Sequence, residues 1–192
     1  MQDWYTADLH LGHGKVAEHR GFGSVGEHDE LILHNLNDIC QPGRRIWILG
    51  DVTSGKDEDK AWEKLAQISQ NKWCSFHLIS GNHDSAHPMH RNSHRNRLAT
   101  PFETIDSMGT FRHNRAKVML SHFPYAGDRG EDRYPEYRLR DTGVPIIHGH
   151  THSTEKVSRS SQGTLQICVS LDAWGMNPVR KEDLTKIINE EN

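Results

Sequence analysis

Short apolar runs that end abruptly at a glycine or a polar residue recur along the chain. The clearest cover residues 4–7, 46–49, 76–79, 118–120 and 144–147. Brief apolar runs bounded by turn-forming and polar residues are typical of strands buried in a sheet. We therefore predict a buried strand at each run, followed directly by polar side chains.

Two segments between the early strands have the spacing of helices instead. In residues 28–39 and 59–69 the apolar positions recur at helical intervals, which places them on one face. The first of these helices is expected to stop before Pro42. The first half of the chain is therefore predicted to run strand, helix, strand, helix, strand.

The second half is richer in strands. Residues 154–157 and 164–170 are predicted to pair as strands joined by residues 158–163, and only residues 180–189 have a further helical pattern. This order favours an α/β fold, a four-layer sandwich of two mixed β-sheets flanked by helices. We expect a single domain over residues 1–192, with ligands bound beyond the carboxyl ends of the strands.

Composition excludes several classes of protein. A formal net charge of -3 and a mean hydropathy of -0.78 indicate a folded, very soluble chain that is not expected to bind long nucleic acids stably. There is no apolar leader and no long apolar run, so neither secretion nor a membrane span is expected. Cys40, Cys74 and Cys168 are expected to be reduced thiols of a cytoplasmic protein. The 15 histidines exceed the needs of a core and direct attention to metal or acid–base chemistry.

Potential metal ligands follow the first two predicted strands. Asp8 and His10 stand two residues apart after the first, and Asp51 follows Gly50 after the second. The two oxygens of a carboxylate allow Asp51 to bridge two cations, and the glycine allows a close backbone approach. Either pattern alone is more often explained by an ordinary turn.

The third strand is followed by the more specific segment Gly81-Asn82-His83-Asp84. Asn82 offers a carbonyl oxygen to a metal, and His83 is a candidate acid for the leaving group. Asp84 is a candidate acceptor for the proton of the His83 ring, which would fix its tautomer. Taken alone, this segment also has the composition of a turn.

Histidines follow the later strands. His122 comes after the strand at 118–120, and His150 and His152 lie two residues apart, which points them to the same side of an extended segment. A single histidine at a strand end is usually structural. That explanation would have to hold at every strand end in turn, so the joint pattern predicts a metal centre.

In this order the motifs resemble those of the calcineurin-like metallophosphoesterase superfamily, which run D-x-H, G-D, G-N-H-D/E, an isolated H, and G-H-x-H. The resemblance implies two β-sheets between helices and two divalent metal ions. Carried over by position, Asp8, His10 and His152 would hold the first metal, Asn82, His122 and His150 the second, and Asp51 would bridge them. His83 matches the proton-donating histidine of the family.

The implied activity is that of a two-metal-dependent phosphoesterase, in which hydroxide held by the metals attacks phosphorus. Mn is the metal expected by resemblance, and the oxygen and nitrogen ligands equally suit Fe, Zn, Co or Ni. His83 and Asp84 are the residues expected to take part in catalysis, beside the ligands.

The absence of arginines at two motif positions reduces the set of candidate substrates. Branches that act on phosphoproteins or dinucleoside polyphosphates place Arg after the second motif and before the third, whereas residues 50–55 contain none and Ser80 precedes Gly81. The chain is more similar to small bacterial and bacteriophage phosphoesterases, in residues 8–13 and 28–30. We expect a phosphodiesterase for small phosphodiesters or nucleotides, with nucleoside 2′,3′-cyclic phosphates as candidates. The alternatives are a phosphomonoesterase and a non-catalytic metal-binding scaffold of the same fold.

Three features have two interpretations. Residues 87–97 are either a basic patch beside His83 or a solvated loop, and residues 123–143 are either a substrate-contacting loop or a surface excursion. His13 either belongs to the site or only starts a helix. The oligomeric state is left open.

Overall fold

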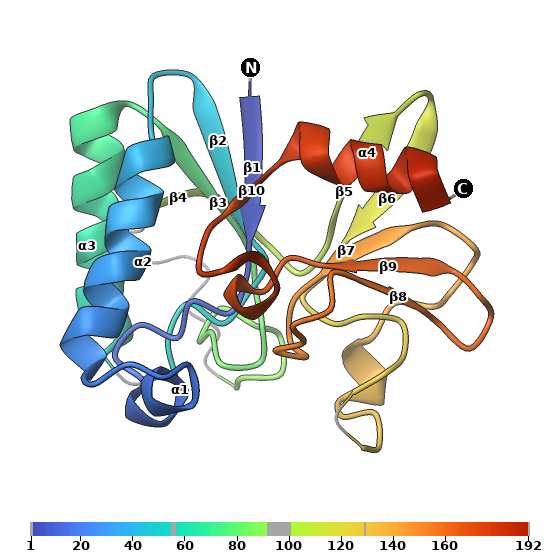
Figure 1. Cartoon of the computed structure of the whole chain (residues 1–192), viewed down its shortest axis with the longest axis horizontal. Coiled ribbons are helices and arrows are strands. Elements are labelled where there is room, and N and C mark those ends of the chain that lie inside the picture. Colours follow the sequence, from blue (N-terminus) through green and yellow to red (C-terminus); the bar gives the residue numbers. More distant parts are fainter. Residues whose placement is uncertain (1, 55–56, 92–100, 129, 192) are drawn as a thin grey trace.

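The computed structural model of the chain describes residues 2–54, 57–91, 101–128 and 130–191, which form two five-stranded sheets with helices against them (Figure 1). In spatial order the first sheet contains β10 (Val179–Arg180), β1 (Gln2–Thr6), β2 (Arg44–Ile48), β3 (Ser75–Ile79) and β4 (Phe102–Asp106). The second contains β5 (Gly109–His113), β6 (Ala116–Leu120), β7 (Ile146–His148), β9 (Leu165–Cys168) and β8 (Val157–Arg159). The helices are α1 (Gly14–His19), α2 (Val25–Ile39), α3 (Glu58–Lys72) and α4 (Lys181–Glu191), with 3-10 turns η1 (Pro135–Tyr137) and η2 (Leu171–Trp174).

Both sheets are mixed. Strands β1 to β4 run parallel, and β10 pairs antiparallel with β1. In the second sheet β6, β7 and β9 run parallel between the antiparallel neighbours β5 and β8. The parallel strands of each sheet therefore bring their carboxyl ends to one edge, where ligands of α/β proteins bind.

Helices α2 and α3 pack together on the first sheet. The hydroxyl of Ser24 accepts a hydrogen bond from the N–H of Glu27 at 3.2 Å and so caps the start of α2. Buried Ile32 and Leu36 of α2 join Trp62 of α3 in a core against β2 and β3. This core supports the strands that carry the first three motifs.

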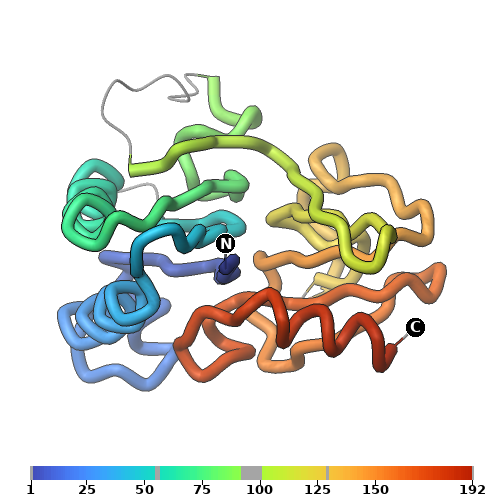
Figure 2. The backbone as a smooth tube through the Cα atoms, turned by 90° about the horizontal axis from the view of Figure 1, so that it is seen from above, coloured from blue at the N-terminus to red at the C-terminus, as the bar shows by residue number. Residues whose placement is uncertain are grey.

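A second core fills the space between the sheets. Leu49 and Ile79 from the first sheet meet Ile147 and Ile167 from the second, and Leu184 of α4 joins them. Helix α4 contacts β1 and β10 of the first sheet and β9 of the second, and it runs across both in Figure 2. The packing of this core sets how the strand ends of the two sheets lie relative to each other.

An irregular segment covers the outer face of the second sheet. Leu165 and Ile167 point into the core between the sheets, so Gln166 points to the opposite face. There the Gln166 side chain accepts a hydrogen bond from the N–H of Ala126 at 3.1 Å and donates one to its carbonyl at 3.0 Å. The layer on this outer face of the second sheet is therefore formed by the segment that follows β6 and includes Ala126.

The predicted α/β class, with two mixed sheets flanked by helices, is confirmed. All five predicted buried strands are present, with bounds shifted by up to two residues. A pair of strands near the C-terminus is present as β8 and β9, but the bounds predicted for the first strand are wrong. Of residues 154–157 only Val157 lies in β8, which extends into the predicted connection at 158–163. Strands β4 and β5 were not expected. Each lies at the edge of its sheet and has several exposed positions, so neither has an apolar run.

The prediction of three reduced thiols is wrong for two of them. Cys40 follows α2 and Cys74 precedes β3, and they form a disulfide with a Cα–Cα distance of 5.4 Å. Only Cys168 is free, and it is buried. The pairing depends on how the ends of α2 and α3 pack, which spacing in the sequence does not reveal. The cysteines therefore no longer support a cytoplasmic location, which stays a prediction.

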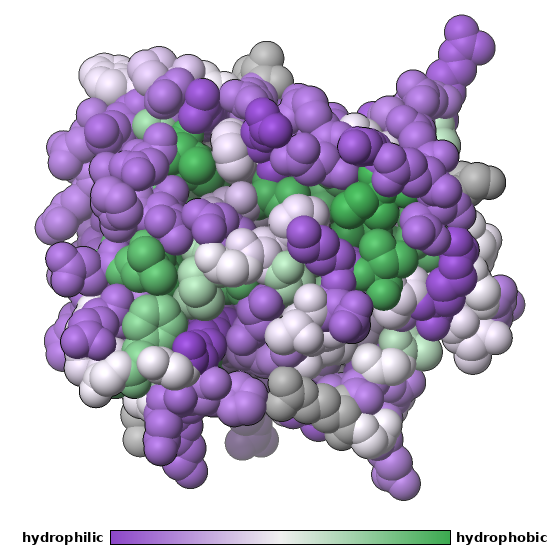
Figure 3. Space-filling model, in the orientation of Figure 1, coloured by the Kyte–Doolittle hydropathy of each residue, from purple (hydrophilic) through white to green (hydrophobic). Residues whose placement is uncertain are grey.

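Hydrophilic side chains cover most of the face seen in Figure 3, and hydrophobic ones gather in separate patches. This distribution agrees with the mean hydropathy of -0.78. In the part of the chain that the structure describes, no helix is both long and apolar enough to cross a membrane.

Candidate metal centre

Residues that follow the parallel strands of both sheets are hydrogen-bonded to one another. The N–H of Asp8, after β1, donates to the carbonyl of Gly50, after β2, at 3.0 Å. The Asp8 carboxylate accepts the N–H of His150, after β7, at 3.0 and 3.1 Å. The N–H of Gly149 donates to the carbonyl of His122, after β6, at 3.0 Å. These bonds join the two sheets at the edge where the motifs lie.

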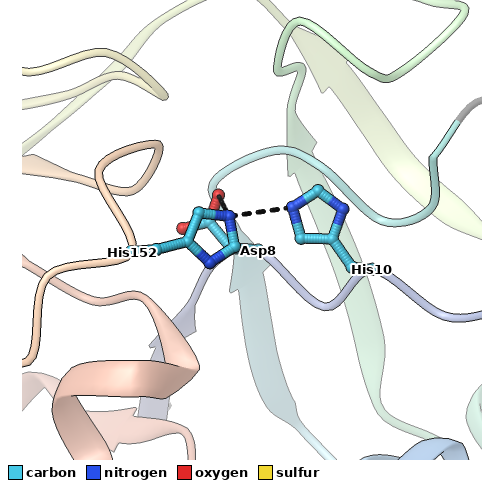
Figure 4. A group of neighbouring side chains, drawn as sticks. All are labelled: Asp8, His10 and His152. Carbon is cyan, nitrogen blue, oxygen red and sulfur yellow. Dashed lines mark hydrogen bonds and ion pairs between the residues drawn. The ribbon is translucent and has the colours of Figure 1, made fainter. Parts of the chain in front are cut away.

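Asp8, His10 and His152 form the first group of candidate metal ligands (Figure 4). One ligand atom from each lies within 4.8 Å of the others. The Nε2 atoms of His10 and His152 are 3.0 Å apart, and Nε2 of His152 is 4.0 Å from Oδ1 of Asp8. Asp8 and His10 are buried, whereas His152 is partly exposed. The structure therefore brings together the three residues predicted to hold the first metal.

Asn82 and His122 belong to the second group, and Asp51 lies beside them. Nε2 of His122 lies 3.5 Å from Oδ2 of Asp51 and 3.2 Å from the amide Oδ1 of Asn82. Asp8 also offers an oxygen within 4.8 Å of the ligand atoms of Asp51 and His122. Nδ1 of His122 donates to the carbonyl of Leu49 at 2.8 Å, so Nε2 is the nitrogen that faces the other ligands.

The seventh predicted ligand, His150, lies beside the second group, and its Nε2 atom contacts neighbouring side chains. Its ring centroid is 5.1 Å from that of His122. Its Nε2 is 2.9 Å from Oδ2 of Asp128 and 3.3 Å from Nη2 of Arg133. Nδ1 has no hydrogen-bond partner among the described residues, so Nδ1 is the atom that this ring offers to a metal.

Asp51 lies between the two groups. Its Oδ2 is 3.7 Å from Nε2 of His10 in the first group and 3.5 Å from Nε2 of His122 in the second. Its Oδ1 accepts the N–H of His83 at 2.9 Å, which orients the carboxylate. A carboxylate within reach of both groups has the position needed to bridge two cations.

Burial and neighbouring charges set the protonation of the ligands. Burial lowers the pKa of His10 well below its usual range and that of His150 to about 3, so both rings are neutral at pH 7. Burial alone would raise the pKa of Asp51, but the neighbouring His122 and His10 have the larger effect and hold this pKa well below its usual range. Burial alone would lower the pKa of His122, but the carboxylate of Asp51 has the larger effect and raises this pKa to about 9. A cation that binds Nε2 of His122 would therefore have to displace a proton from the ring.

The donor set fits divalent metal ions. It combines carboxylate and amide oxygens with imidazole nitrogens, which suits Mn, Fe, Zn, Co and Ni. Nδ1 of His152 is 3.0 Å from Oδ2 of Asp172 and donates to it, so the Nε2 lone pair faces His10 and Asp8. These ligands do not select one metal among the five.

Most of the candidate ligands have a left-handed backbone. The φ angles are 58° at Asp8, 47° at His10, 57° at Asp51, 70° at His150 and 48° at His152. This conformation costs a non-glycine residue roughly 1–3 kcal/mol, and residues that adopt it are more frequent at functional sites. Backbone hydrogen bonds maintain it here, among them the bond from the N–H of His10 to the carbonyl of Asp51 at 3.0 Å.

His83 lies at the rim of the centre. Its Nε2 is 4.0 Å from Oδ2 of Asp51, its ring centroid is 5.4 Å from that of His10, and 43% of its side chain is exposed. A side chain beside the ligands yet open to solvent has the placement of an acid. Its role in catalysis stays a prediction.

The predicted contact between Asp84 and His83 is wrong. Oδ2 of Asp84 accepts the N–H groups of Gly81 at 2.7 Å and Asp51 at 2.9 Å, and Oδ1 accepts that of Val52 at 2.9 Å. Asp84 is fully buried, whereas His83 is open to solvent. Asp84 therefore holds the loops after β2 and β3 together, and it is not a catalytic partner of His83.

His13 lies close to the first group. Its ring centroid is 5.5 Å from that of His10, and it occupies the N-cap position of α1 without a side-chain capping bond. The structure therefore places His13 both at a helix start and beside the centre.

Two histidines of the described part of the basic segment contact residues near the centre. His87 is buried edge-on against the rings of Phe123 and Tyr137. The ring of His90 donates from Nε2 to the carbonyl of Asn82 at 3.0 Å. His94, Arg95 and Arg97 lie outside the described residues. Within residues 87–91, His87 is buried, whereas Pro88, His90 and Arg91 are exposed, so both interpretations of this segment stay open.

The segment at 123–143 returns to the second group. Asp128 contacts His150, and the Tyr134 ring centroid is 5.9 Å from the His150 ring. Arg133 and Arg138 both pair with Asp128, at 3.0 and 3.1 Å. Arg129 lies outside the described residues. The segment therefore borders the centre instead of projecting away from it.

Sequence reasoning missed the carboxylates that contact the ring nitrogens of two ligands, Asp172 on His152 and Asp128 on His150. Asp172 lies just beyond the predicted strand 164–170, which is the same signal that identified Asp8. Asp128 follows no strand, and no sequence signal marks it.

No family model matches the chain. It is 38% identical to the Gene 66 protein of Mycobacterium phage L5 over 206 aligned positions, which cover 98% of this chain and 96% of the relative. The Gene 66 protein of Mycobacterium phage D29 is also 38% identical, over 97% of this chain and 96% of the relative. Among solved structures, the protein of unknown function AQ665 from Aquifex aeolicus has a TM-score of 0.70 at 20% identity and covers 97% of this chain and 98% of its own. It shares the fold. The residues of the motifs meet at one edge of the two mixed sheets, as the resemblance to calcineurin-like metallophosphoesterases implies.

Proposed function

Because this chain belongs to the family of the mycobacteriophage Gene 66 proteins and joins two groups of metal ligands through one carboxylate, we propose that it is a two-metal-dependent phosphoesterase. The observation that carries the proposal is the position of Asp51, 3.7 Å from His10 and 3.5 Å from His122. A lone structural metal would need only one of the two groups.

Two bound divalent cations lower the pKa of water and offset the negative charge of a phosphate. The residues of the chain position the metal ions and supply the proton. Asp51 links the two groups, and the carboxylates on His150 and His152 orient their rings. His83, exposed beside the centre, donates a proton to the departing oxygen.

The preferred substrate is a small phosphodiester. Asp128 and Arg133 contact His150 of the second group, and Arg138 and Asp132 belong to the same set of ion pairs. The formal charges of these four side chains sum to zero. A monoester dianion needs more positive charge beyond the metals than a diester, which carries one negative charge. The neutral cluster therefore favours a diester, with a nucleoside 2′,3′-cyclic phosphate as the candidate.

Hydrolysis assays with metal control test this proposal. Activity on bis(p-nitrophenyl) phosphate should vanish after exhaustive chelation and return on adding Mn²⁺. Undiminished turnover by metal-free protein would overturn the mechanism. Under one metal condition, kcat/KM should be higher for bis(p-nitrophenyl) phosphate than for p-nitrophenyl phosphate, and an advantage for the monoester would reject the diester preference. Inactivity on a 2′,3′-cyclic nucleotide would remove only that candidate.

A further inference from the structure

A buried ion pair lies behind the first group of ligands. The side chain of Arg20, at the end of α1, is 3% exposed, and that of Asp172, in η2, is 10% exposed. Nε and Nη2 of Arg20 donate to Oδ1 and Oδ2 of Asp172 at 3.1 and 2.7 Å. This two-bond geometry sets the relative orientation of the two planar groups.

The remaining donors of Arg20 face the loop that carries Asp8 and His10. Nη2 also donates to the carbonyl of Asp8 at 2.8 Å, and Nη1 donates to that of Leu9 at 3.4 Å. Both carbonyls belong to the stretch whose backbone is left-handed at Asp8 and His10. Arg20 therefore binds this strained loop directly.

His28 and Asp29 hold the same arrangement from α2. Nε2 of His28 is 3.0 Å from Nη1 of Arg20, and Nδ1 of His28 is 2.9 Å from Oδ1 of Asp29. Both oxygens of Asp29 accept the N–H of Gly12, at 3.0 and 3.1 Å. The loop from Asp8 to Gly12 is thus held at both ends by one connected set of polar side chains.

Asp172 extends this set to the third ligand of the first group. Its Oδ2 accepts from Nδ1 of His152 at 3.0 Å and from the hydroxyl of Ser170 at 2.7 Å. Because Nδ1 carries the proton, Nε2 is left to face the other two ligands. All three ligands of the first group therefore depend on the Arg20–Asp172 pair, directly or through one further residue.

We propose that Arg20 and Asp172 are positioning residues for the first metal position, with Arg20 holding the loop of Asp8 and His10 and Asp172 presenting Nε2 of His152. The inference rests on the proposed metal centre. A buried ion pair adds little net stability compared with apolar packing, so stability alone does not account for it. Its contacts join ligands from both sheets.

The test is Mn²⁺ titration by calorimetry, with thermal unfolding of the chelated protein as a second readout. Asp172→Asn should weaken one of two Mn²⁺ sites by about 10- to 100-fold and leave the other unchanged. Arg20→Lys keeps the charge but loses the two-bond geometry, and it should weaken the same site. The double variant Asp172→Asn/His10→Ala should bind Mn²⁺ as His10→Ala alone does, because both changes act on one site.

Asp3→Asn is the matched control. Asp3 is buried and forms the same two-bond pair with Arg45, at 2.7 and 2.9 Å, away from the ligands. It should lower the unfolding temperature without changing Mn²⁺ binding. Unchanged binding in Asp172→Asn, equal weakening of both sites, or loss of folding in both Asp172→Asn and Arg20→Lys would overturn the inference. The outcome is independent of turnover. A protein that binds two Mn²⁺ but hydrolyses nothing would refute only the phosphoesterase proposal, and a wild-type protein that binds no Mn²⁺ would refute both.

Discussion

Replacing Gly50 by alanine tests how closely the two ligand groups are packed. Gly50 has a φ of +85°, and a Cβ there would lie 2.7 Å from both Cα and N of Gly81 and nearer still to Nδ1 of His122. Neither neighbour moves easily. The N–H of Gly81 is bonded to Asp84, and Nδ1 of His122 to the carbonyl of Leu49.

Two costs add in this variant. A left-handed backbone costs alanine about 1–2 kcal/mol, and overpacking of a tight interior costs about 1–3 kcal/mol. Gly163→Ala is the matched control, because Gly163 has a φ of +82° and nothing within 4 Å of its added Cβ. We expect the free energy of unfolding to fall by about 1–2 kcal/mol in Gly163→Ala and by about 2–5 kcal/mol in Gly50→Ala.

Urea unfolding of the chelated proteins and Mn²⁺ titration measure the two effects. Gly50→Ala should be the less stable variant by about 1–3 kcal/mol and should bind Mn²⁺ more weakly, because the added methyl displaces His122. Gly163→Ala should bind Mn²⁺ like the wild type. Equal stability and equal binding in the two variants would refute the close packing of Gly50 against the centre.

Substitutions at three residues of the centre separate the roles of these residues. Asp51→Asn should weaken both Mn²⁺ sites and His10→Ala only one; two full equivalents bound in Asp51→Asn would contradict the bridging position. His83→Ala should keep both metals and lose about 10²- to 10⁴-fold in kcat with a poor leaving group, and less with nitrophenol. Equal losses on the two substrates would reject His83 as the acid. Without metal, the free energy of unfolding should be about 1 kcal/mol higher for His10→Gly than for His10→Ala. Residue 10 has a φ of 47°, a left-handed conformation that strains alanine more than glycine. Stability equal to or below that of the alanine variant would show that the backbone there is not strained.

The sequence predicts the parts of this fold that are buried. Strands β1, β2 and β3 lie in the interior of the first sheet, so each contains a buried apolar run and the polar residue after each run is conspicuous. Asp8, Asp51 and Asn82, which follow these strands, are recognisable as candidate ligands for this reason. The same reasoning misses β4 and β5, since edge strands with exposed positions have no such run.

Partners that depend on tertiary packing are not visible in the sequence. Asp84 is adjacent to His83 in the chain, which suggests a pair, yet its oxygens bind N–H groups that meet only when β2 and β3 align. Cys40 and Cys74 come within bonding distance only after α2 and α3 pack on the first sheet. In each case the nearest residue in sequence is a poor guide to the partner in space.

The centre is best understood as an interface between the two sheets. The loop after β1 supplies Asp8 and His10, whereas His152 follows β7 of the second sheet. Neither sheet alone holds a complete first group. Asp172, which orients His152, is bound through Arg20 to the loop of the first sheet. The spacing of the ligands is therefore set by contacts between the sheets, and the apolar core between them contributes to metal binding although it contains no ligand.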